Sequence, residues 1–266
     1  MAKAFDSSME NPGSDAIADA FSQPFGRGML YPRPPYSYRD AQMGLLLFRA
    51  DAAAVRRNLP PGVTLIDKTP LCLVNFASYA HTAFGPYQEV YVAVQVQFRG
   101  ETYMYSPMMF SDNEGATAAG RELWGFAKKR AAMRFERAGE QICFTAERPA
   151  GHPVISCSVT AERLATPAEF AAIAFPTLTM RIIPNHDAGS RPSVCQLLAT
   201  RNQKRYHQSA FGTDELWSGR PALRIDSHSE VDPWHDFQPV ELIGGWFSHS
   251  DLELPAATLV HDYLAP

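Results

Sequence analysis

The sequence predicts a mainly β (α+β) fold, in which an antiparallel, barrel-like sheet carries a few short peripheral helices. The strongest observation is the alternation over residues 89–98. Every second residue from Val90 to Phe98 is apolar or aromatic and faces one way, while Glu89 and Tyr91 are on the opposite face. Short turns rich in Gly and Pro join this stretch to other alternating stretches. Helical patterns are few and short, so strands joined by turns dominate.

Composition sets the broad class. The chain has 266 residues, is 45% hydrophobic and carries a net charge of −4, which suits a globular protein with a sizeable core. We expect an N-terminal arm over residues 1–30 and a single domain over residues 31–266. A slightly acidic chain is a poor general nucleic-acid binder.

The cysteines and the N-terminus bear on the compartment. The four cysteines lie singly in apolar stretches with no CxxC pair, which favours buried thiols in a reducing compartment over zinc or disulfides. The N-terminal stretch has no apolar segment typical of a signal peptide, and no run is long enough to span a bilayer. We therefore expect a cytoplasmic protein.

The N-terminal half alternates strands with short helices. In the arm, Ser14 can cap a short helix that carries Ile17 and Phe21 on one face. Asp51 can cap a helix over residues 52–59, which two prolines end. Strands are expected over the following residues: 43–49, 71–81, 89–98 and 103–110.

The C-terminal half is predicted less uniformly. Asp112 or Asn113 can cap a short helix, and Thr166 with Glu169 forms a capping box for another. Residues 227–239 resemble a loop. Strands are expected over the following residues, with weaker signals for 194–202 and 223–226: 132–137, 141–148, 154–163, 178–183, 194–202, 223–226 and 257–264.

A cluster of cations follows an apolar stretch. Lys128, Lys129 and Arg130 come directly after Trp124 and Phe126. A lysine that lies against an apolar surface beside other cations is a candidate amine nucleophile, since burial and like charge both favour the uncharged amine. Such an amine attacks a ketone and forms a Schiff base. The alternative is a solvated turn or a nucleic-acid patch, because long charged side chains are mostly exposed.

The residues around this cluster resemble the signature of the acetoacetate decarboxylase family, whose namesake is itself a standard example of a lysine activated by desolvation or a cationic neighbour. The similarity runs from about Tyr31 to the C-terminus. The motifs that carry it are Asp112-Asn113-Glu114, Ala118-Ala119-Gly120-Arg121-Glu122, Gly125-Phe126, Lys128-Lys129 and Met180-Arg181-Ile182-Ile183-Pro184-Asn185. The resemblance implies a cone-like antiparallel β-barrel, a homo-oligomer, and Lys128 as the lysine that forms the imine.

Strand geometry separates the two lysines. Adjacent residues of a strand point to opposite faces, so Lys129 is expected to point away from a pocket that Lys128 enters. We therefore expect the apolar wall with Trp124 and Phe126 to favour the free amine of Lys128 more than repulsion by Lys129 does.

The resemblance also implies further site residues, with two departures. Glu89 matches the family's glutamate in a Gly-x-Tyr-x-Glu turn. Asn75 stands where the family has a second glutamate, and Ala41 stands where it has an arginine. Arg39 lies two residues before Ala41, on the same face of a regular strand, and could replace that arginine. Loss of a nearby anion weakens a site for decarboxylation.

Three other polar residues are candidates for substrate contact: Tyr79, Gln196 and Tyr263. Each can instead satisfy local hydrogen bonds, as buried Tyr and Gln commonly do.

Three functions remain open. The preferred one is an aldolase-dehydratase that condenses pyruvate with an aldehyde through a Lys128 imine and enamine, with Glu89 as general acid and base. The second is an acetoacetate-type β-keto acid decarboxylase that uses the same lysine imine. The third is a non-catalytic binder of small carbonyl metabolites. The expected partners are a small oxo acid and an aldehyde, with no nucleic acid and no membrane.

No metal or cofactor is expected. The eight histidines form no HExxH spacing. His228, Asp232, His235 and Asp236 could gather round a cation, but a loop of solvated polar residues is the preferred interpretation. No glycine-rich nucleotide fingerprint and no Gly-x-Ser-x-Gly elbow occur. Imine chemistry requires no cofactor.

Overall fold

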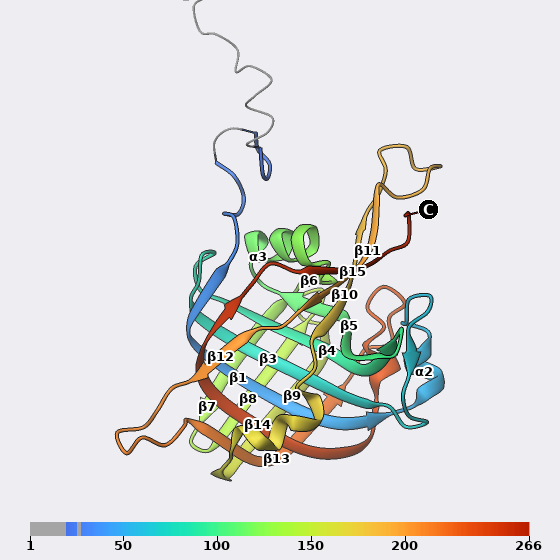
Figure 1. Ribbon diagram of the computed structural model, residues 1–266. Helices are drawn as coiled ribbons and strands as arrows, with labels where there is room; N and C mark the ends of the chain where they lie inside the picture. The colour runs from blue at the N-terminus through green and yellow to red at the C-terminus, as the bar shows by residue number, and fades with distance from the viewer. Residues whose placement is uncertain (1–19, 26–27, 266) are drawn as a thin grey trace, which may run out of the picture.

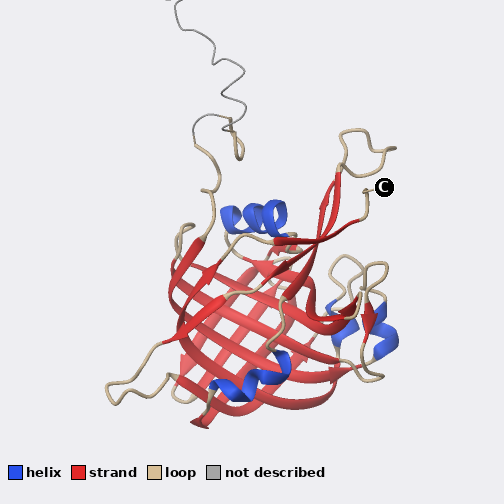
Figure 2. Cartoon of the chain, viewed as in Figure 1, coloured by secondary structure: helices blue, strands red, loops and turns tan. Residues whose placement is uncertain are grey.

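The computed structural model describes residues 20–25 and 28–265 (Figure 1). The helix expected after Ser14 falls outside the described residues. A curled sheet forms the body of the molecule, and short helices lie at its periphery (Figure 2). This arrangement confirms the mainly β fold.

The described strands form one sheet of fifteen strands. Its main path runs β15-β11-β10-β5-β4-β3-β1-β14-β13-β9-β8-β7, with β12 beside β14, β2 beside β4 and β6 beside β5. Most neighbours are antiparallel, but β5 pairs in parallel with both β6 and β10. The sheet is therefore mixed, and its hydrogen-bonded path ends at β15 and β7 without closing on itself.

The strands of the first half have these bounds: β1 Tyr36–Ala50, β2 Thr64–Leu65, β3 Leu71–His81, β4 Tyr87–Phe98, β5 Glu101–Ser111, β6 Lys128–Arg130 and β7 Ala132–Ala138. Those of the second half are β8 Gln141–Glu147, β9 Pro153–Leu164, β10 Thr177–Ile183, β11 Val194–Thr200, β12 Gln203–Tyr206, β13 Leu216–Ile225, β14 Pro239–Leu254 and β15 Thr258–Asp262. The helices are α2 Ala52–Arg56, α3 Glu114–Ala119, the π-helix η1 Gly120–Trp124, and the 3₁₀ helices η2 Pro167–Ile173 and η3 Trp234–Phe237.

The helix starts follow the capping residues. Asp51 accepts a hydrogen bond from the Ala54 N–H at the start of α2, which ends at Arg56, earlier than expected. Asn113 accepts from the Ala116 N–H at 2.9 Å and begins α3. The side chain of Glu169 accepts from the Thr166 N–H, as a capping box requires, although the helix is 3₁₀ rather than α.

Strand β3 separates two regions of packing. Cys72, Val74 and Phe76 point into the largest apolar core. Ala77 and Tyr79, on the opposite face, pack in a second cluster that also contains residues of α3 and η1. Because both faces of β3 are covered, the largest apolar core lies on one side of the strand and the second apolar cluster on the other.

Strand β14 is the largest difference from the sequence prediction. It pairs with β1 from Tyr36 opposite Leu254 to Ala50 opposite Pro239, and so occupies the centre of the sheet. Adjacent Gly244 and Gly245 interrupt its alternation, and its half towards the C-terminus carries several polar residues. The short strand β12 was also missed, and β1 begins before the predicted strand.

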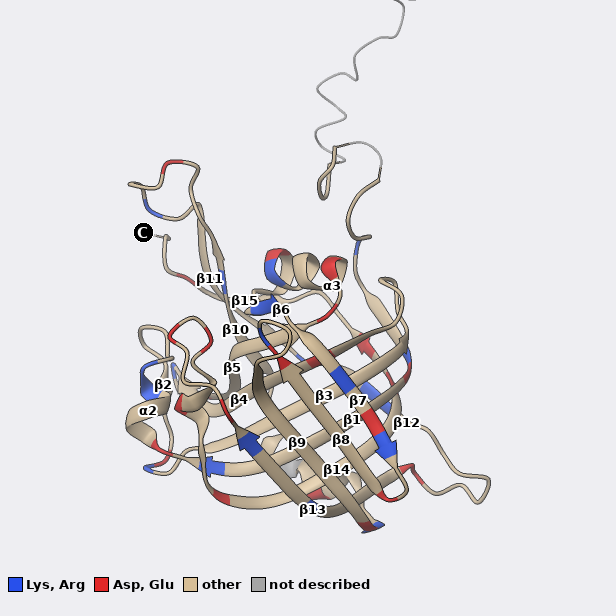
Figure 3. Ribbon diagram, turned by 180° about the vertical axis from the view of Figure 1, so that it is seen from behind, with Lys and Arg blue, Asp and Glu red and all other residues tan. Residues whose placement is uncertain are grey.

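One edge of the sheet, at β7, is charged. Strand β7 lies at one end of the main path and carries residues of both signs, visible from behind in Figure 3. Arg134 and Glu136 form an ion pair on it at 2.5 Å. Charged side chains on an edge strand disfavour pairing with another sheet. In the described part of the chain, no helix combines the length and the apolar content that crossing a membrane requires.

Candidate active site

A small pocket lies on the α3 side of the sheet, where the second apolar cluster surrounds a few polar groups. Its volume is about 40 Å³, which leaves room for about three water-sized groups. Its lining combines an amine, a carboxylate, phenols and apolar side chains: Tyr38, Met43, Tyr79, Glu89, Tyr91, Met109, Phe126, Lys128, Thr177, Asn202, Leu252 and Leu254.

Strand register brings the polar groups together. Lys128 on β6 lies opposite Met109 on β5, which lies opposite Tyr91 on β4. Glu89 precedes Tyr91 by two residues and therefore shares its face. The side chains of Lys128 and Glu89 thus project from neighbouring positions of the same surface, as the alternation of residues 89–98 predicts for Glu89 and Tyr91.

The central pair of the pocket is Lys128 and Glu89. Lys128 Nζ lies 2.6 Å from Glu89 Oε2, and the two side chains are only 5% and 9% exposed. The two groups form a close ion pair, and Glu89 Oε2 has no hydrogen-bond partner among the described residues. The apolar wall expected around the amine is therefore interrupted by a carboxylate that contacts it.

Phenols and an aromatic ring complete the polar wall. Burial raises the pKa of Tyr79 and of Tyr38 well above the usual value, and the charge of Glu89 raises both further. These groups remain neutral hydrogen-bond donors at physiological pH. The Tyr79 hydroxyl lies 3.5 Å from Glu89 Oε1, and Lys128 Nζ lies 5.7 Å from the centre of the Phe126 ring.

The π-helix η1 and the turn after it fit closely against Lys128. A Cβ at Gly120 would lie 2.8 Å from Cδ of Lys128. Gly125 has a φ of 69°, and a Cβ there would lie 2.6 Å from the backbone of Arg181. Trp124 is fully buried behind Phe126 and donates from Nε1 to the carbonyl of Pro255. Trp124 supports the wall but does not line the pocket.

Lys129 lies on the opposite face of β6, as strand geometry predicts. Its ammonium donates to Asp232 Oδ1 at 2.9 Å and to the carbonyl of Val231. Asp232 also accepts from Arg148. The charge of Lys129 is therefore compensated away from the pocket, and repulsion between the two lysines is not what would favour the free amine of Lys128.

Arg39 does not enter the pocket, so the expectation that it replaces the family's arginine is wrong. Its side chain is 65% exposed and pairs with Asp251 at 2.8 Å. The reason is a break in β1: the register with β14 shifts between Tyr38 and Ala41, and Asp40 has a φ of 57°. At such a bulge, two residues along the chain no longer share a face.

Two further candidates, both half-buried, lie outside the pocket. Gln196 donates to Asp262 at 2.9 Å across the β11–β15 pair. Tyr263 donates its hydroxyl to the carbonyl of Pro61. Neither lines the described pocket, so each satisfies local hydrogen bonds, which was the alternative interpretation.

Asn75 occupies a neighbouring cavity. It is buried opposite Tyr91, and its Nδ2 has no hydrogen-bond partner among the described residues. This second cavity has a volume of about 180 Å³ and shares Met43 with the Lys128 pocket. Asn75 is therefore adjacent to the pocket rather than within its lining.

Sequence reasoning missed much of the lining. Met109 and Leu252 belong to β5 and the unpredicted β14, and Asn202 follows β11. Tyr91 was placed on the face of Glu89, and that shared face was the signal that could have identified it.

The cluster around residue 232 also differs from the prediction. Asp232 and Asp236 are buried, not solvated. Asp232 pairs with Lys129 and Arg148, and Asp236 pairs with Arg57. The two carboxylates that could have bound a metal are therefore paired with cationic side chains.

The fold and the site define a class: a mainly β protein with a buried lysine and carboxylate pair in a small pocket, a constellation suited to Schiff-base chemistry on a carbonyl compound. A sequence model of the family described as acetoacetate decarboxylase (ADC) matches residues 21–264. The chain belongs to the acetoacetate decarboxylase family, and it is an enzyme, a lyase.

Relatives and solved structures agree with this assignment. An acetoacetate decarboxylase of Chromobacterium violaceum is 29% identical over 92% of this chain and 96% of its own. A solved acetoacetate decarboxylase superposes with a TM-score of 0.84 at 26% identity, covering 96% of this chain and 100% of the other.

A more distant structure shares the fold. The enduracididine biosynthesis enzyme MppR, complexed with the condensation product of pyruvate and imidazole 4-carboxaldehyde, superposes with a TM-score of 0.76 at 18% identity. The match covers 91% of this chain and 97% of that one.

Proposed function

We propose that this lyase is an acetoacetate-type β-keto acid decarboxylase that releases CO₂ through an imine on Lys128. The observation that carries the proposal is the buried pair of Lys128 and Glu89 at 2.6 Å in a pocket of about 40 Å³. The curated relatives named acetoacetate decarboxylase support this reaction over the aldol condensation that the sequence favoured.

Glu89 provides a route to the free amine. In a medium of low polarity, an ion pair competes with the neutral pair in which the proton has moved to the carboxylate. Glu89 accepts the proton of Lys128 as the substrate enters, and the amine is then free to attack. Glu89 thus acts as a general base next to the nucleophile.

The bond changes follow from imine chemistry. Lys128 Nζ attacks the ketone carbon, and the carbinolamine takes the proton back from Glu89 and loses water to form an iminium ion, which leaves Glu89 as a carboxylate. The bond to the carboxylate carbon breaks, CO₂ leaves, and the electron pair moves to the iminium nitrogen, giving an enamine. The enamine carbon takes a proton from solvent, and water then hydrolyses the iminium ion, which releases the ketone and restores the ion pair of Lys128 and Glu89.

The charges of the pocket favour loss of a carboxylate. Among the described lining residues, Lys128 is the only cation, and Glu89 is the only anion. A substrate carboxylate therefore meets no second cation that would stabilise it, while the charge of Glu89 disfavours it. Loss of CO₂ removes this unfavourable charge, so the pocket stabilises the transition state relative to the ground state.

An aldolase-dehydratase remains a second candidate. The neighbouring cavity of about 180 Å³ shares Met43 with the Lys128 pocket and contains Asn75, whose Nδ2 has no hydrogen-bond partner within the described residues. An aldehyde there would lie beside an enamine formed on Lys128. This reaction keeps the carboxylate of pyruvate, for which the described lining offers no cation besides Lys128.

Two incubations distinguish the candidates. The protein is mixed with acetoacetate alone, with CO₂ release followed, and with pyruvate plus an aromatic aldehyde, with absorbance of a conjugated product followed. The proposal expects CO₂ from acetoacetate that Lys128→Arg abolishes. A conjugated product without CO₂ release would support the second candidate and contradict the first.

A further inference from the structure

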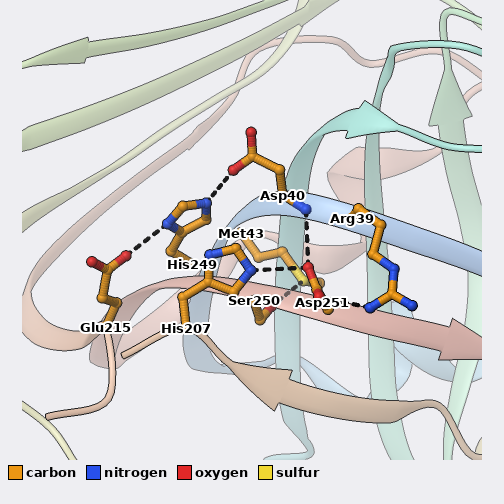
Figure 4. A network of polar contacts seen from close by, with 8 residues as sticks. All are labelled: Arg39, Asp40, Met43, His207, Glu215, His249, Ser250 and Asp251. Carbon is orange, nitrogen blue, oxygen red and sulfur yellow. Dashed lines mark hydrogen bonds and ion pairs between the residues drawn. The ribbon is translucent and has the colours of Figure 1, made fainter. Parts of the chain in front are cut away.

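A cluster of histidines and carboxylates gathers around β14, with His249 and Asp251 at its centre (Figure 4). His249 and Asp251 alternate along β14 with Ser250 and Leu252, of which Ser250 is buried and Leu252 lines the pocket. The cluster therefore lies outside the proposed reaction site, separated from it by the sheet.

Three side chains of this cluster converge from distant parts of the chain. Asp40 comes from β1, His249 from β14 and His207 from the turn after β12. One ligand atom from each lies within 4.8 Å of the other two. The imidazole rings of His207 and His249 are 4.1 Å apart between centres. Asp40 accepts a hydrogen bond from Nε2 of His249.

Each imidazole has a carboxylate within hydrogen-bond distance of one of its ring nitrogens. Glu215 Oε2 lies 2.6 Å from Nδ1 of His249. Asp251 Oδ1 lies 2.9 Å from Nε2 of His207. The remaining ring nitrogen of His207 is on the side of His249 and Asp40 (Figure 4). Histidines that bind metals characteristically donate their other N–H to a carboxylate in this way, which fixes the tautomer and the ring orientation.

The backbone directs Asp40 into this arrangement. Its φ of 57° is uncommon for a residue with a side chain, and it lies at the bulge that also turns Arg39 outward. The Asp40 N–H donates to Asp251 Oδ1 at 3.1 Å, and Arg39 donates to the other oxygen. Asp251 is thus fixed from three sides while it orients His207.

We propose that Asp40, His207 and His249 form a binding site for one divalent cation of the zinc class. Two imidazoles and a carboxylate are ligands that Zn²⁺ takes at about 2.0–2.2 Å, with a water completing the tetrahedron. The ion lies between Asp40 and Nε2 of His249 and replaces their direct contact. All three side chains are partly exposed, so a cation reaches them from solvent.

The role of the cation is structural. It joins β1, β14 and the segment after β12, which are otherwise held by strand pairing and ion pairs. Because the cluster and the pocket lie on opposite faces of β14, the cation takes no part in the imine chemistry. This inference is independent of the proposed reaction.

The test is titration of chelator-treated, dialysed full-length protein with Zn²⁺, followed by calorimetry and thermal unfolding. We expect one Zn²⁺ per chain and a rise in Tm of a few degrees on loading. His207→Gln and Asp40→Asn should each weaken binding at least ten-fold. His228→Gln is the matched control, since its ring pairs with His235 elsewhere in the fold, and should bind like the parent.

Circular dichroism of the metal-free variants shows whether they fold, and Co²⁺ loading gives a spectroscopic readout of a tetrahedral site. If the parent binds no Zn²⁺, or if His207→Gln binds Zn²⁺ as tightly as the parent, the residues form only an ion-pair cluster and the proposal is overturned. Turnover that changes on Zn²⁺ loading of the parent but not of Asp40→Asn would contradict the structural role.

Discussion

Gly120 lies against Lys128 so closely that no side chain fits between them. A Cβ at Gly120 would lie 2.8 Å from Cδ and 2.9 Å from Cε of Lys128. The π-helix that contains Gly120 therefore sets the path of the lysine towards Glu89. A wider turn at a functional position is a known use of π-helices.

Gly120→Ala is expected to displace Lys128 more than it unfolds the protein, because the methyl group meets a flexible side chain. Displacement of a reacting group by about 1 Å costs on the order of 100-fold in rate, so we expect about that loss of turnover on acetoacetate with a small change in Tm. Gly189→Ala is the control, since its Cβ would meet only a carboxylate oxygen at 3.5 Å. Unchanged turnover in Gly120→Ala would show that the close fit is unimportant.

Glu89→Gln keeps the shape of the side chain and removes the base. We expect turnover to fall by about 10²- to 10⁴-fold, the usual contribution of a general base. Exposed Glu101→Gln serves as control. Steady-state rates with acetoacetate measure the effect, and a loss of less than about three-fold would remove Glu89 from the proposed mechanism.

Lys129→Met is expected to affect stability rather than catalysis. The variant leaves the buried carboxylate of Asp232 with Arg148 as its remaining ion-pair partner among the described residues. Loss of a hydrogen-bonded partner of this kind costs about 1–3 kcal/mol, so Tm should fall while turnover stays within about two-fold. If turnover instead fell as far as in Lys128→Arg, Lys129 would act on the amine after all.

Glu169 gives a pH dependence with a defined sign. The hydrogen bonds from Arg163, with those from Trp246 and the Thr166 N–H, lower the pKa of Glu169 from 4.5 to about 2. A lowered pKa stabilises the fold fully above pH 4.5, and the contribution is lost as pH falls towards 2. The Tm difference between the parent and Glu169→Gln should therefore be constant above pH 4.5 and shrink below it. A difference that grows as pH falls would contradict the assignment.

The sequence identified the parts of the fold in which local pattern and tertiary environment agree. The alternation in residues 89–98 reflects a real division between the core and the pocket. The cap at Asn113 and the capping box of Thr166 and Glu169 could be predicted because capping depends on a few adjacent residues. Strand β14 could not be predicted from its sequence. The adjacent Gly244 and Gly245 and the polar residues on one face interrupt the alternation, although the other face of the strand is buried.

The residues of the site that belong to a local sequence motif could be predicted, and the others could not. Lys128 and Glu89 lie together because strand register places them so, and both motifs were visible in the sequence. Arg39 was misassigned because a bulge at Asp40 breaks the alternation, and nothing in the local sequence marks it. Asp40, His207 and His249 lie far apart in the chain, so only the pairing of β1, β12 and β14 brings them together.

The most direct test of the central claim is borohydride reduction of the protein with acetoacetate, followed by peptide mass mapping. The account predicts a reduced adduct on Lys128 in the parent and none in Lys128→Arg. Reduction of the adduct on Lys129 or another lysine, or the absence of any adduct while CO₂ is still released, would contradict it.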